Sequence, residues 1–323
     1  MGDQRFAPSP LDRNAPVFVA GHRGMVGSAI CRCLSAQGFT NVLTRTRDEL
    51  DLADRHATFA FFREARPQVV VLAAARVGGI LANSTMPVDF ISENLQIQVN
   101  VLDAALDQRV SRLLFLGSSC IYPKFAPQPI TEDALLTGAL EPTNDAYAIA
   151  KIAGIIHVQS VRRQYQLPWI SAMPTNLYGP NDNFSEDTSH VLPALIRRYE
   201  DAMTCGERLV TNWGSGTPRR EFLHVDDMAA ACLHLLENYD GPSQVNVGTG
   251  IDHTISEVAR TVADAVGYTG ETHWDTSRPD GTPRKLLDVS LLRATGWEAR
   301  ISLERGVADT VDWYRTHHAS VRV

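Results

Sequence analysis

A tyrosine and a lysine four positions apart, Tyr147 and Lys151, stand in a segment with the character of a helix. Positions i and i+4 share one helix face, and an ammonium beside a phenol favours the phenolate and lowers the pKa of the phenol. Such a tyrosine can protonate a carbonyl oxygen while a hydride reaches the carbon. Gly117-Ser118-Ser119 ends an earlier apolar run, where its hydroxyls are suited to orient the same carbonyl. Together these residues predict a ketone-reducing site.

A glycine-rich turn follows the first apolar run, Val17–Ala20, with the spacing G-x-x-G-x-x-G. The first glycine permits a tight turn, the second lets a pyrophosphate approach the backbone, and the third lets a helix pack closely on the strand. The N-terminus of that helix offers unpaired N–H groups to phosphates. We predict a dinucleotide site here, with contacts from Gly21, Arg23, Gly24, Met25, Val26 and Gly27.

The end of the second expected strand bears on the choice between NAD and NADP. NAD enzymes usually place an acidic residue there to hold the ribose hydroxyl. This chain instead has Arg47 at the position where the 2′-phosphate of NADP would lie. Arg23 in the glycine turn is able to bind the same phosphate. The planar guanidinium donates paired hydrogen bonds that suit a 2′-phosphate. We therefore expect NADPH/NADP+, while Asp48 and Asp51 nearby keep NAD as a second candidate.

The segments that must position these residues alternate between short β-rich runs and helical stretches. Continuous apolar strands separated by helices indicate an α/β fold with a doubly wound parallel (Rossmann) sheet covered on both faces. The expected strands are Val17–Ala20, Asn41–Arg45, Val69–Ala75, Leu113–Gly117, Trp169–Met173 and Gln244–Val247, with helices from near Val88 and over Val225–Leu236.

After Tyr178 the chain becomes richer in loops, which indicates a second, smaller C-terminal lobe. We assign residues 1–178 plus about 223–250 to the NADP-binding Rossmann domain. Residues of about 179–222 plus 251–323 form the expected substrate-binding lobe. The absence of a flexible linker between these stretches predicts interleaved lobes.

Composition excludes several classes of protein. With 323 residues, 44% hydrophobic and 21% charged, the chain is typical of a soluble globular protein. A net charge of −7 argues against nucleic acid and anionic membranes as partners. No apolar run reaches the ~18 residues that span a bilayer. Residues 1–10 are polar and proline-rich, unlike a signal peptide, so we expect a cytoplasmic protein.

The cysteines and histidines show no metal-binding pattern. Five cysteines are an odd number, and no pair of them has zinc spacing. Most are expected to be reduced thiols that fill small apolar spaces. No cluster of His, Asp and Glu has metal spacing either, and His224 is expected to be structural. We predict no metal.

Longer segments resemble the GDP-L-fucose synthase family, within the extended short-chain dehydrogenases/reductases. The segments are Gly21–Gly27, Gly117–Lys124, Leu140–Asn144, Pro174–Pro180, Gly214–Pro218, Arg220–Met228 and Pro279–Asp288. The resemblance extends from about residue 16 to about residue 315. It implies NADPH-dependent conversion of GDP-4-keto-6-deoxy-D-mannose to GDP-L-fucose by 3,5-epimerisation followed by 4-keto reduction. It also implies a homodimer formed through a pair of helices.

The same resemblance implies a role for each motif residue. Ser118, Tyr147 and Lys151 would be the reductase trio, and Cys120 and His190 the acid–base pair of the epimerisation. The implied substrate contacts are Arg198, Trp213, Arg220 and Asp280. The implied cofactor contacts, besides the glycine turn and Arg47, are Lys151, Pro174, Asn176, Leu177 and His190.

The chemistry of a keto sugar agrees with those roles. A C4 ketone acidifies the protons on C3 and C5, and inversion needs a base and an acid on opposite sides of the ring. Cys120 lies two residues beyond Ser118 and is a plausible base, while His190 is a plausible acid near neutral pH. The enolate oxygen is the atom that Tyr147 and Ser118 would hold, so one polarising site serves both half-reactions.

The GDP end of such a substrate is anionic although the chain is acidic, so local cations must receive it. Three separate loops supply them, and Trp213 offers a flat face for a base or sugar. The grouped cations are Arg197, Arg198, Arg219, Arg220, Arg284 and Lys285.

Two alternatives stay open. A plain nucleotide-sugar 4-reductase or a 4-epimerase would keep Tyr147 and Lys151 but would not need Cys120 and His190. A non-catalytic NADPH-binding sensor would be expected to lose Tyr147 or Lys151, and both are present.

Overall fold

A six-stranded, wholly parallel sheet forms the centre of the computed structural model, which describes residues 9–185, 188–278 and 280–317. The strand order is β2-β1-β3-β4-β5-β9, and every neighbouring pair is parallel. The strands are β1 (Val17–Ala20), β2 (Val42–Leu43), β3 (Val69–Leu72), β4 (Arg112–Leu116), β5 (Ile170–Pro174) and β9 (Val245–Val247). The predicted doubly wound sheet is confirmed, although β2 and β3 are shorter than the expected strands Asn41–Arg45 and Val69–Ala75.

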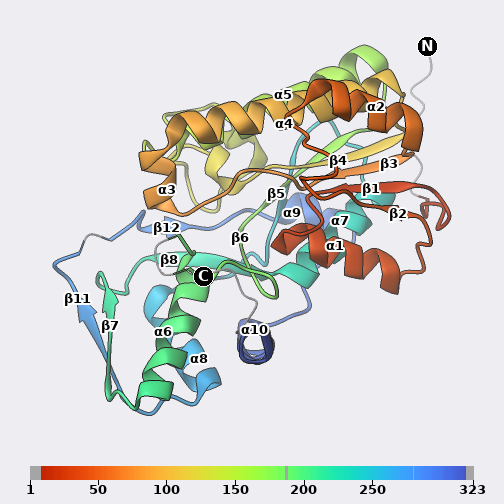
Figure 1. Ribbon diagram of the computed structural model, residues 1–323. Helices are drawn as coiled ribbons and strands as arrows, with labels where there is room; N and C mark the ends of the chain where they lie inside the picture. The colour runs from red at the N-terminus through yellow and green to blue at the C-terminus, as the bar shows by residue number, and fades with distance from the viewer. Residues whose placement is uncertain (1–8, 186–187, 279, 318–323) are drawn as a thin grey trace.

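Helices cover both faces of this sheet, which explains why β1 and β3 are apolar and buried at every position. Figure 1 shows α2 (Arg55–Ala65), α4 (Pro87–Asp107) and α5 (Asp145–Tyr165) on one face. The other face carries α1 (Met25–Ala36) and α7 (Val225–Asn238). Alternate residues of β1 enter the two cores, Phe18 and Ala20 on the α4–α5 side and Val17 and Val19 on the α1–α7 side.

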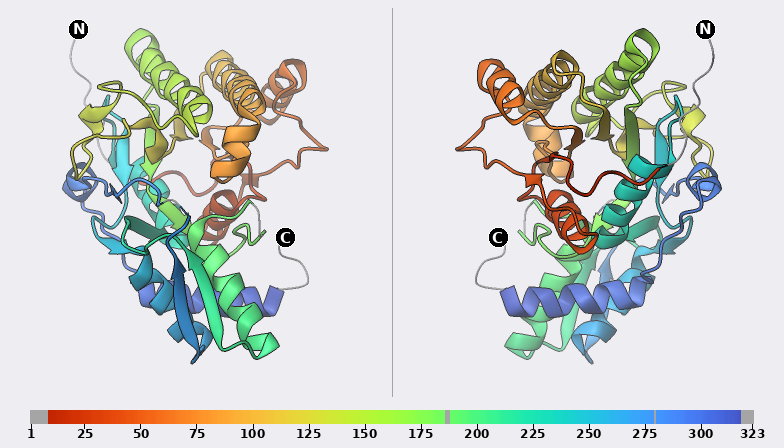
Figure 2. Two further views of the ribbon diagram at one scale, coloured as in Figure 1. Left: turned by 90° about the vertical axis from the view of Figure 1, so that its left-hand side faces the viewer. Right: turned by 90° about the vertical axis from the view of Figure 1, so that its right-hand side faces the viewer.

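A smaller body lies beyond the carboxyl ends of the strands (Figures 1 and 2). One of its sheets joins β10 (Asp252–Thr254), β8 (Arg219–His224) and β12 (Arg284–Lys285), with β6 (Asn176–Tyr178) also paired to β8. A second sheet pairs β7 (Leu209–Trp213) with β11 (Glu271–Asp275). Its helices are α6 (Val191–Cys205), α8 (Ile255–Val266) and α10 (Leu303–His317), around a core that includes Tyr178, Phe184, Tyr199, Phe222 and Tyr314.

The two lobes are interleaved along the chain, and more so than predicted. As expected, α7 and β9 return to the six-stranded sheet. The chain then returns once more, because Leu287 and Val289 join the core under α4 and α5, and Leu292 and Trp297 join the core under α1 and α7. The predicted division placed all of 251–323 in the second lobe, and the packing of these four side chains differs from it.

Within the described residues, no helix combines the length and the apolar character needed to cross a bilayer. The segment 1–8 and the end of the chain from residue 318 lie outside the described residues.

Candidate active site

The glycine turn connects β1 to α1 as predicted, and its glycines differ in what surrounds them. Gly21 has a positive φ of 89°, and a side chain there would come within 2.7 Å of the Ala74 nitrogen. A side chain at Gly27 would collide with the Gly21 carbonyl. Gly24 is different, because a Cβ there would meet only the Gly21 oxygen, at 3.4 Å. The protein itself leaves space beside Gly24.

The first turn of α1 also lacks the groups that usually satisfy its amides. Gly24 is the N-cap and offers no side-chain hydrogen bond, and the turn contains no acidic residue. Met25 and Val26 open the helix and pack partly against the core. A helix start without a cap, beside a glycine with open space, suits the pyrophosphate of a dinucleotide. The residues present therefore fit such a cofactor.

The two arginines expected to select NADP lie near the end of β2. Hydrogen bonds from Thr46 lower the pKa of Glu49, and the charges of Arg45 and Arg23 lower it further. Arg23 therefore lies near the loop that carries Arg47. The Arg47 guanidinium is 2.9 Å from a Glu93 oxygen of α4, and 69% of the Arg47 side chain is exposed. Sequence reasoning missed this ion pair because Glu93 belongs to a distant helix.

The end of β4 presents Ser118 and Cys120 on a short 3-10 turn, η1 (Ser119–Ile121). The Ser118 hydroxyl oxygen caps this turn by accepting the Cys120 N–H at 3.2 Å. Gly117 lies at the point where a side chain would collide with Met173 of β5. The strand end therefore fixes both functional side chains relative to the sheet.

Lys151 is buried on α5, with only 3% of its surface exposed. Its ammonium donates to the Leu116 carbonyl at 2.8 Å and lies 4.9 Å from the centre of the Phe115 ring. Its distance to the centre of the Tyr147 ring is 5.8 Å. Burial lowers the pKa of Lys151 to about 8. The helix thus places the two predicted side chains close together, with the ammonium tied to the end of β4.

Tyr147 is hydrogen-bonded to Ser118, so the predicted trio is brought together. One expectation is wrong, however. The pKa of Tyr147 is raised, first by burial and then by negative charge on Cys120, while the Ser118 hydrogen bond opposes the rise. The reason is that the phenol is desolvated beside a thiol, whereas the Lys151 ammonium is tied to a backbone carbonyl. A phenol that keeps its proton is suited to donate it.

Cys120 has two partners that sequence reasoning did not assign to it. Asn144 donates from its side-chain nitrogen to the sulfur at 3.3 Å, and the Lys285 ammonium lies 3.8 Å from the same atom. Both residues stand in segments that carry the family resemblance, yet only their place in the fold reveals the contact. The Asn144 side-chain oxygen is buried and has no hydrogen-bond partner among the described residues.

His190 occupies the N-cap position of α6, at the start of the second lobe. Its surface is exposed, yet the protein around the ring lowers its pKa by desolvation. The loop before it reaches the first lobe, because a side chain at Gly79 would come within 3.2 Å of the Thr188 carbonyl oxygen. His190 therefore lies where the two lobes meet, although no described residue links it directly to Cys120.

Two of the expected substrate contacts are held by the second lobe. Arg198 of α6 donates to the side-chain oxygen of Asn212 at 2.7 Å, and Asn212 is buried. Arg220 of β8 donates to the Arg219 carbonyl at 2.8 Å, and burial lowers the pKa of Arg220.

Of the other two expected substrate contacts, Trp213 ends β7 and Asp280 lies on the loop after β11. Trp213 is 65% exposed and has the Arg278 guanidinium 5.0 Å from its ring centre. Asp280 accepts the Ser215 N–H at 2.9 Å and the Ser215 hydroxyl at 2.7 Å, and these bonds lower the pKa of Asp280. The Asp280 carboxylate therefore joins the two loops.

The segment after β5 contains the remaining expected cofactor contacts. Pro174 ends β5, Leu177 packs partly against the α1–α7 core, and Asn176 donates to the Glu221 carbonyl at 2.8 Å. Glu221, which sequence reasoning missed, is fully buried. Its carboxylate accepts the backbone N–H of Gly250 at 2.7 Å and that of Leu287 at 3.0 Å, so it holds three segments together.

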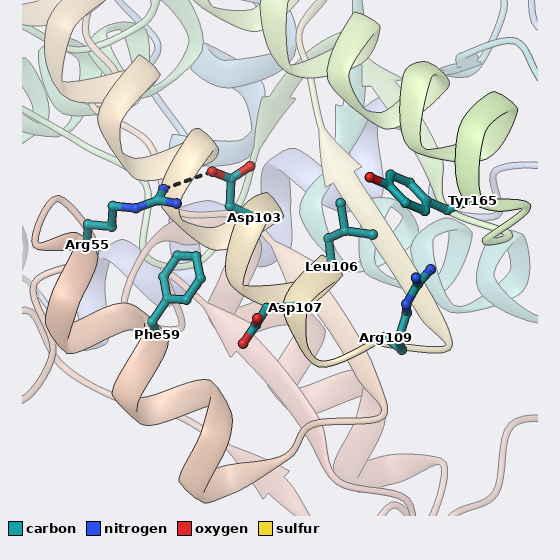
Figure 3. Close-up of a pocket in the computed structure, with 7 residues that line it drawn as sticks. All are labelled: Arg55, Phe59, Asp103, Leu106, Asp107, Arg109 and Tyr165. Atoms are coloured by element: carbon teal, nitrogen blue, oxygen red, sulfur yellow. Dashed lines mark hydrogen bonds and ion pairs between the residues drawn. The ribbon is translucent and has the colours of Figure 1, made fainter.

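A surface hollow of about 420 Å³, whose lining residues are drawn in Figure 3, includes none of these residues. Its lining comes from α2, from the carboxyl ends of α4 and α5, and from the turn after α4. The Arg55–Asp103 ion pair, at 2.8 Å, crosses it. Tyr147 and Lys151 lie near the opposite end of α5.

His224 has the expected structural role, since its Nδ1 accepts the Asp226 N–H and caps α7. The described residues contain no group of three potential metal ligands.

Comparison with known proteins adds an independent finding. The model of the NAD dependent epimerase/dehydratase family matches residues 17–248. GDP-L-fucose synthase 1 of Arabidopsis thaliana is 57% identical over 306 residues, covering 95% of this chain and 95% of that protein. GDP-L-fucose synthase of Escherichia coli (strain K12) is 55% identical over 307 residues, covering 92% of this chain and 96% of that protein.

A solved structure agrees at the level of the fold. The crystal structure of a GDP-L-fucose synthetase from Naegleria fowleri bound to NADP matches with a TM-score of 0.91 at 29% identity. The match covers 98% of this chain and 97% of that chain.

Proposed function

The chain belongs to the NAD dependent epimerase/dehydratase family, and we propose that it converts GDP-4-keto-6-deoxy-D-mannose to GDP-L-fucose with NADPH. The proposed reaction inverts C3 and C5 of the sugar and then reduces the C4 ketone. The high identity to GDP-L-fucose synthases confirms the family resemblance that the motifs carry. Within the structure, the observation that carries the proposal is the thiol of Cys120 beside the paired hydroxyls of Ser118 and Tyr147.

The cofactor is NADPH, which supplies the hydride when it is bound. The uncapped start of α1 and the open side of Gly24 receive its pyrophosphate. Arg23 and Arg47 bind the 2′-phosphate. Lys151 uses one of its three N–H bonds on Leu116, which leaves donors for the nicotinamide end. Contacts from Pro174, Asn176, Leu177 and His190 complete the site.

Epimerisation is carried out by Cys120 as the base and His190 as the acid. The sulfur takes a proton from the carbon beside the ketone, and the C–H electron pair passes to the C4 oxygen. Ser118 and Tyr147 donate hydrogen bonds to that oxygen while it carries the charge. His190 then returns a proton to the opposite face of the ring. Its lowered pKa makes the imidazolium give up a proton more readily.

Reduction uses the same carbonyl grip. Tyr147 protonates the C4 oxygen as the hydride reaches the carbon, and its raised pKa ensures that the phenol still holds that proton at neutral pH. Ser118 keeps the oxygen in line through its hydrogen bond with Tyr147. Lys151 positions both groups through the end of β4.

The nucleotide end of the substrate is bound by the second lobe. Arg198 and Arg220 pair with the diphosphate, Trp213 stacks on a flat group, and Asp280 orders the loop around it. The other four of the six cations expected for this role have contacts within the protein. Arg219 and Arg284 both pair with Asp252, Arg197 pairs with Asp201, and Lys285 lies at Cys120.

One experiment tests the function and separates it from its alternatives. The protein is incubated with GDP-4-keto-6-deoxy-D-mannose and NADPH in deuterated water, and the sugar product is identified by NMR. We expect GDP-L-fucose with deuterium at C3 and C5. A plain 4-reductase would give a non-inverted deoxyhexose without deuterium at those carbons. A sensor would leave the sugar unchanged.

We also infer a homodimer formed through α4 and α5. These helices lie side by side on the outside of the sheet (Figure 2) and expose Val99, Ile149 and Ile156 at 39%, 44% and 37%. Burying such side chains against a second copy would stabilise the pair. Light scattering should show a dimer, and Val99→Glu with Ile156→Glu should show a monomer. Leu209→Glu, at an exposed site on β7, is the matched control and should stay dimeric.

Two further proposals concern the chain as a whole. All five cysteines are free thiols, which supports a cytoplasmic location. We assign cofactor binding to the lobe built on the six-stranded sheet and binding of the GDP-sugar to the smaller lobe.

A further inference from the structure

Two pairs of basic side chains face each other across the neighbouring strands β8 and β12. The register pairs Arg219 with Arg284 and Arg220 with Lys285. Side chains alternate between the two sides of a strand, so these two pairs lie on opposite sides of the sheet. The surroundings of the two pairs differ sharply in charge.

Asp252 neutralises the first pair. Its carboxylate accepts the Arg219 Nε at 3.0 Å and also pairs with Arg284. The second pair has no such partner, because no described carboxylate lies within 4.0 Å of the charged nitrogens of Arg220 or Lys285. The half-buried ammonium of Lys285 has a different partner.

The side chain of Lys285 reaches the first lobe. Its ammonium lies 3.8 Å from the Cys120 sulfur, which also accepts a hydrogen bond from the Asn144 side chain at 3.3 Å. The sulfur therefore has two N–H donors, one of them charged. A cation beside a thiol stabilises the thiolate, which is the form that can accept a proton.

The backbone around Lys285 is fixed on several sides, so this contact is built into the fold. Leu286 donates to the Gln128 side chain at 2.8 Å, and its carbonyl accepts the Ile130 N–H at 2.8 Å. Leu287 donates to the buried carboxylate of Glu221 at 3.0 Å. These three hydrogen bonds, on the two residues that follow Lys285, fix the position of the strand and therefore of the Lys285 backbone.

We propose that Lys285 is a positioning residue for Cys120, which keeps the thiolate available as the base of the epimerisation. The inference rests on the proposed function and adds a residue to it. In the step, the C–H bond breaks, the S–H bond forms, and the electron pair passes to the carbonyl oxygen. Lys285 keeps its protons throughout. Its charge compensates the sulfur before the transfer, and Asn144 holds the sulfur in place.

The first test needs no substrate. The thiolate is the species that iodoacetamide alkylates, so the alkylation rate of Cys120 at fixed pH reports its availability. Lys285→Met should lower this rate about tenfold, as expected for loss of a unit charge near 4 Å in partly screened surroundings. Lys285→Arg should keep most of it. Cys205 is exposed at the end of α6 and serves as the internal standard, with both peptides quantified by mass spectrometry.

The second test follows the reaction. Without NADPH, Lys285→Met should slow deuterium uptake at C3 and C5 of the keto sugar by about tenfold. The control is Lys124→Met, which removes a lysine four residues after Cys120 that pairs with Glu141 at 2.9 Å. Its rate of deuterium uptake should stay within about twofold of the wild-type rate. Lys285→Gln provides a second uncharged side chain, and NADPH binding with a thermal melt verifies folding of each variant.

The outcomes separate the two proposals. An unchanged ratio of Cys120 to Cys205 alkylation in both uncharged variants overturns the role of Lys285. That role is also overturned if Lys285→Arg loses as much as Lys285→Met, because the effect would then come from shape and not from charge. Wild-type protein that alkylates as expected but exchanges no deuterium would refute the proposed function while leaving the Lys285–Cys120 pair intact.

Discussion

The residues proposed for reduction and those proposed for epimerisation are held in different ways. Ser118, Tyr147 and Lys151 all come from the first lobe, where Lys151 is hydrogen-bonded to Leu116, the last residue of β4, two residues before Ser118. Cys120 shares that strand end, but its charged partner Lys285 arrives from β12 of the second lobe. His190 likewise begins the first helix of that lobe. The reductase trio is therefore complete within one lobe, whereas the epimerase set needs both.

The largest effect is expected from Tyr147→Phe, which removes the hydroxyl that serves both steps. Reduction should fall by roughly 10²–10⁴, the usual contribution of a positioned general acid. Deuterium exchange should fall less, because Ser118 still holds the carbonyl oxygen. Stopped-flow NADPH oxidation and NMR exchange measure the two rates. Equal losses would remove the distinction between the two sets of residues.

Cys120→Ser should separate the sets in the opposite direction. A serine hydroxyl is a far weaker acid than a thiol, so almost no anion is available as a base at neutral pH. Exchange at C3 and C5 should fall by about 10² or more, as for loss of a general base. The variant should still bind NADPH and slowly reduce the unepimerised ketone. Wild-type exchange at both carbons would remove Cys120 from the mechanism.

A smaller effect is expected at the far end of the cofactor. Changing Arg23 and Arg47 together to Met removes two charges proposed to bind the 2′-phosphate. The KM for NADPH should rise about 10- to 100-fold, and the KM for NADH should stay nearly constant. Steady-state kinetics with both cofactors provide the measurement. Glu93→Gln releases Arg47 from its ion pair and should lower the KM for NADPH.

The smallest effect concerns stability. Burial lowers the pKa of Lys151 to about 8, so the folded protein binds this proton less tightly than the unfolded chain does. This group therefore destabilises the fold at pH 7, and the penalty disappears as the pH rises from about 8 towards the ordinary lysine value. In urea unfolding at pH 7, Lys151→Met should have a free energy of unfolding about 1–3 kcal/mol higher than wild type, although it cannot reduce substrate.

The pH dependence provides the control for that measurement. Groups other than Lys151 titrate alike in both proteins, so only the difference between them is used. The advantage of the variant should shrink between pH 7 and pH 10. A variant that is less stable than wild type at pH 7 would show that the lysine contributes more through packing and its hydrogen bond than its burial costs.

Local spacing in the sequence was enough for some parts of this site. The glycine turn and the i, i+4 pair of Tyr147 and Lys151 depend on the geometry of a single turn or helix, which the sequence states directly. The pKa of Tyr147 could not be predicted that way, because it depends on which groups surround the phenol in space. The partners Glu93 and Lys285 were missed for the same reason, since each is brought by a distant segment.

Apolar spacing has a similar limit. The helix near Val88 was expected from its apolar residues, and α4 confirms it. Phe90 and Leu102 of α4 are buried, yet Val99 on the same helix is exposed. Periodicity alone cannot distinguish a face that packs within the chain from one that is left outside. The buried polar residues Asn94 and Gln98 on the same helix show that burial also follows hydrogen-bonding partners, since they bond to the Phe90 and Ala150 carbonyls.

The late return of the chain to the first lobe affects how the protein is made. Strand β9 pairs with β5, and the core beneath α4 and α5 is filled only when Leu287 and Val289 arrive. During synthesis, the ribosome must therefore release most of the polypeptide before the sheet has its final edge. Until then the edge of β5 is open to pairing with other nascent chains. We expect the growing chain to be a client of chaperones until the segment beyond residue 289 has emerged.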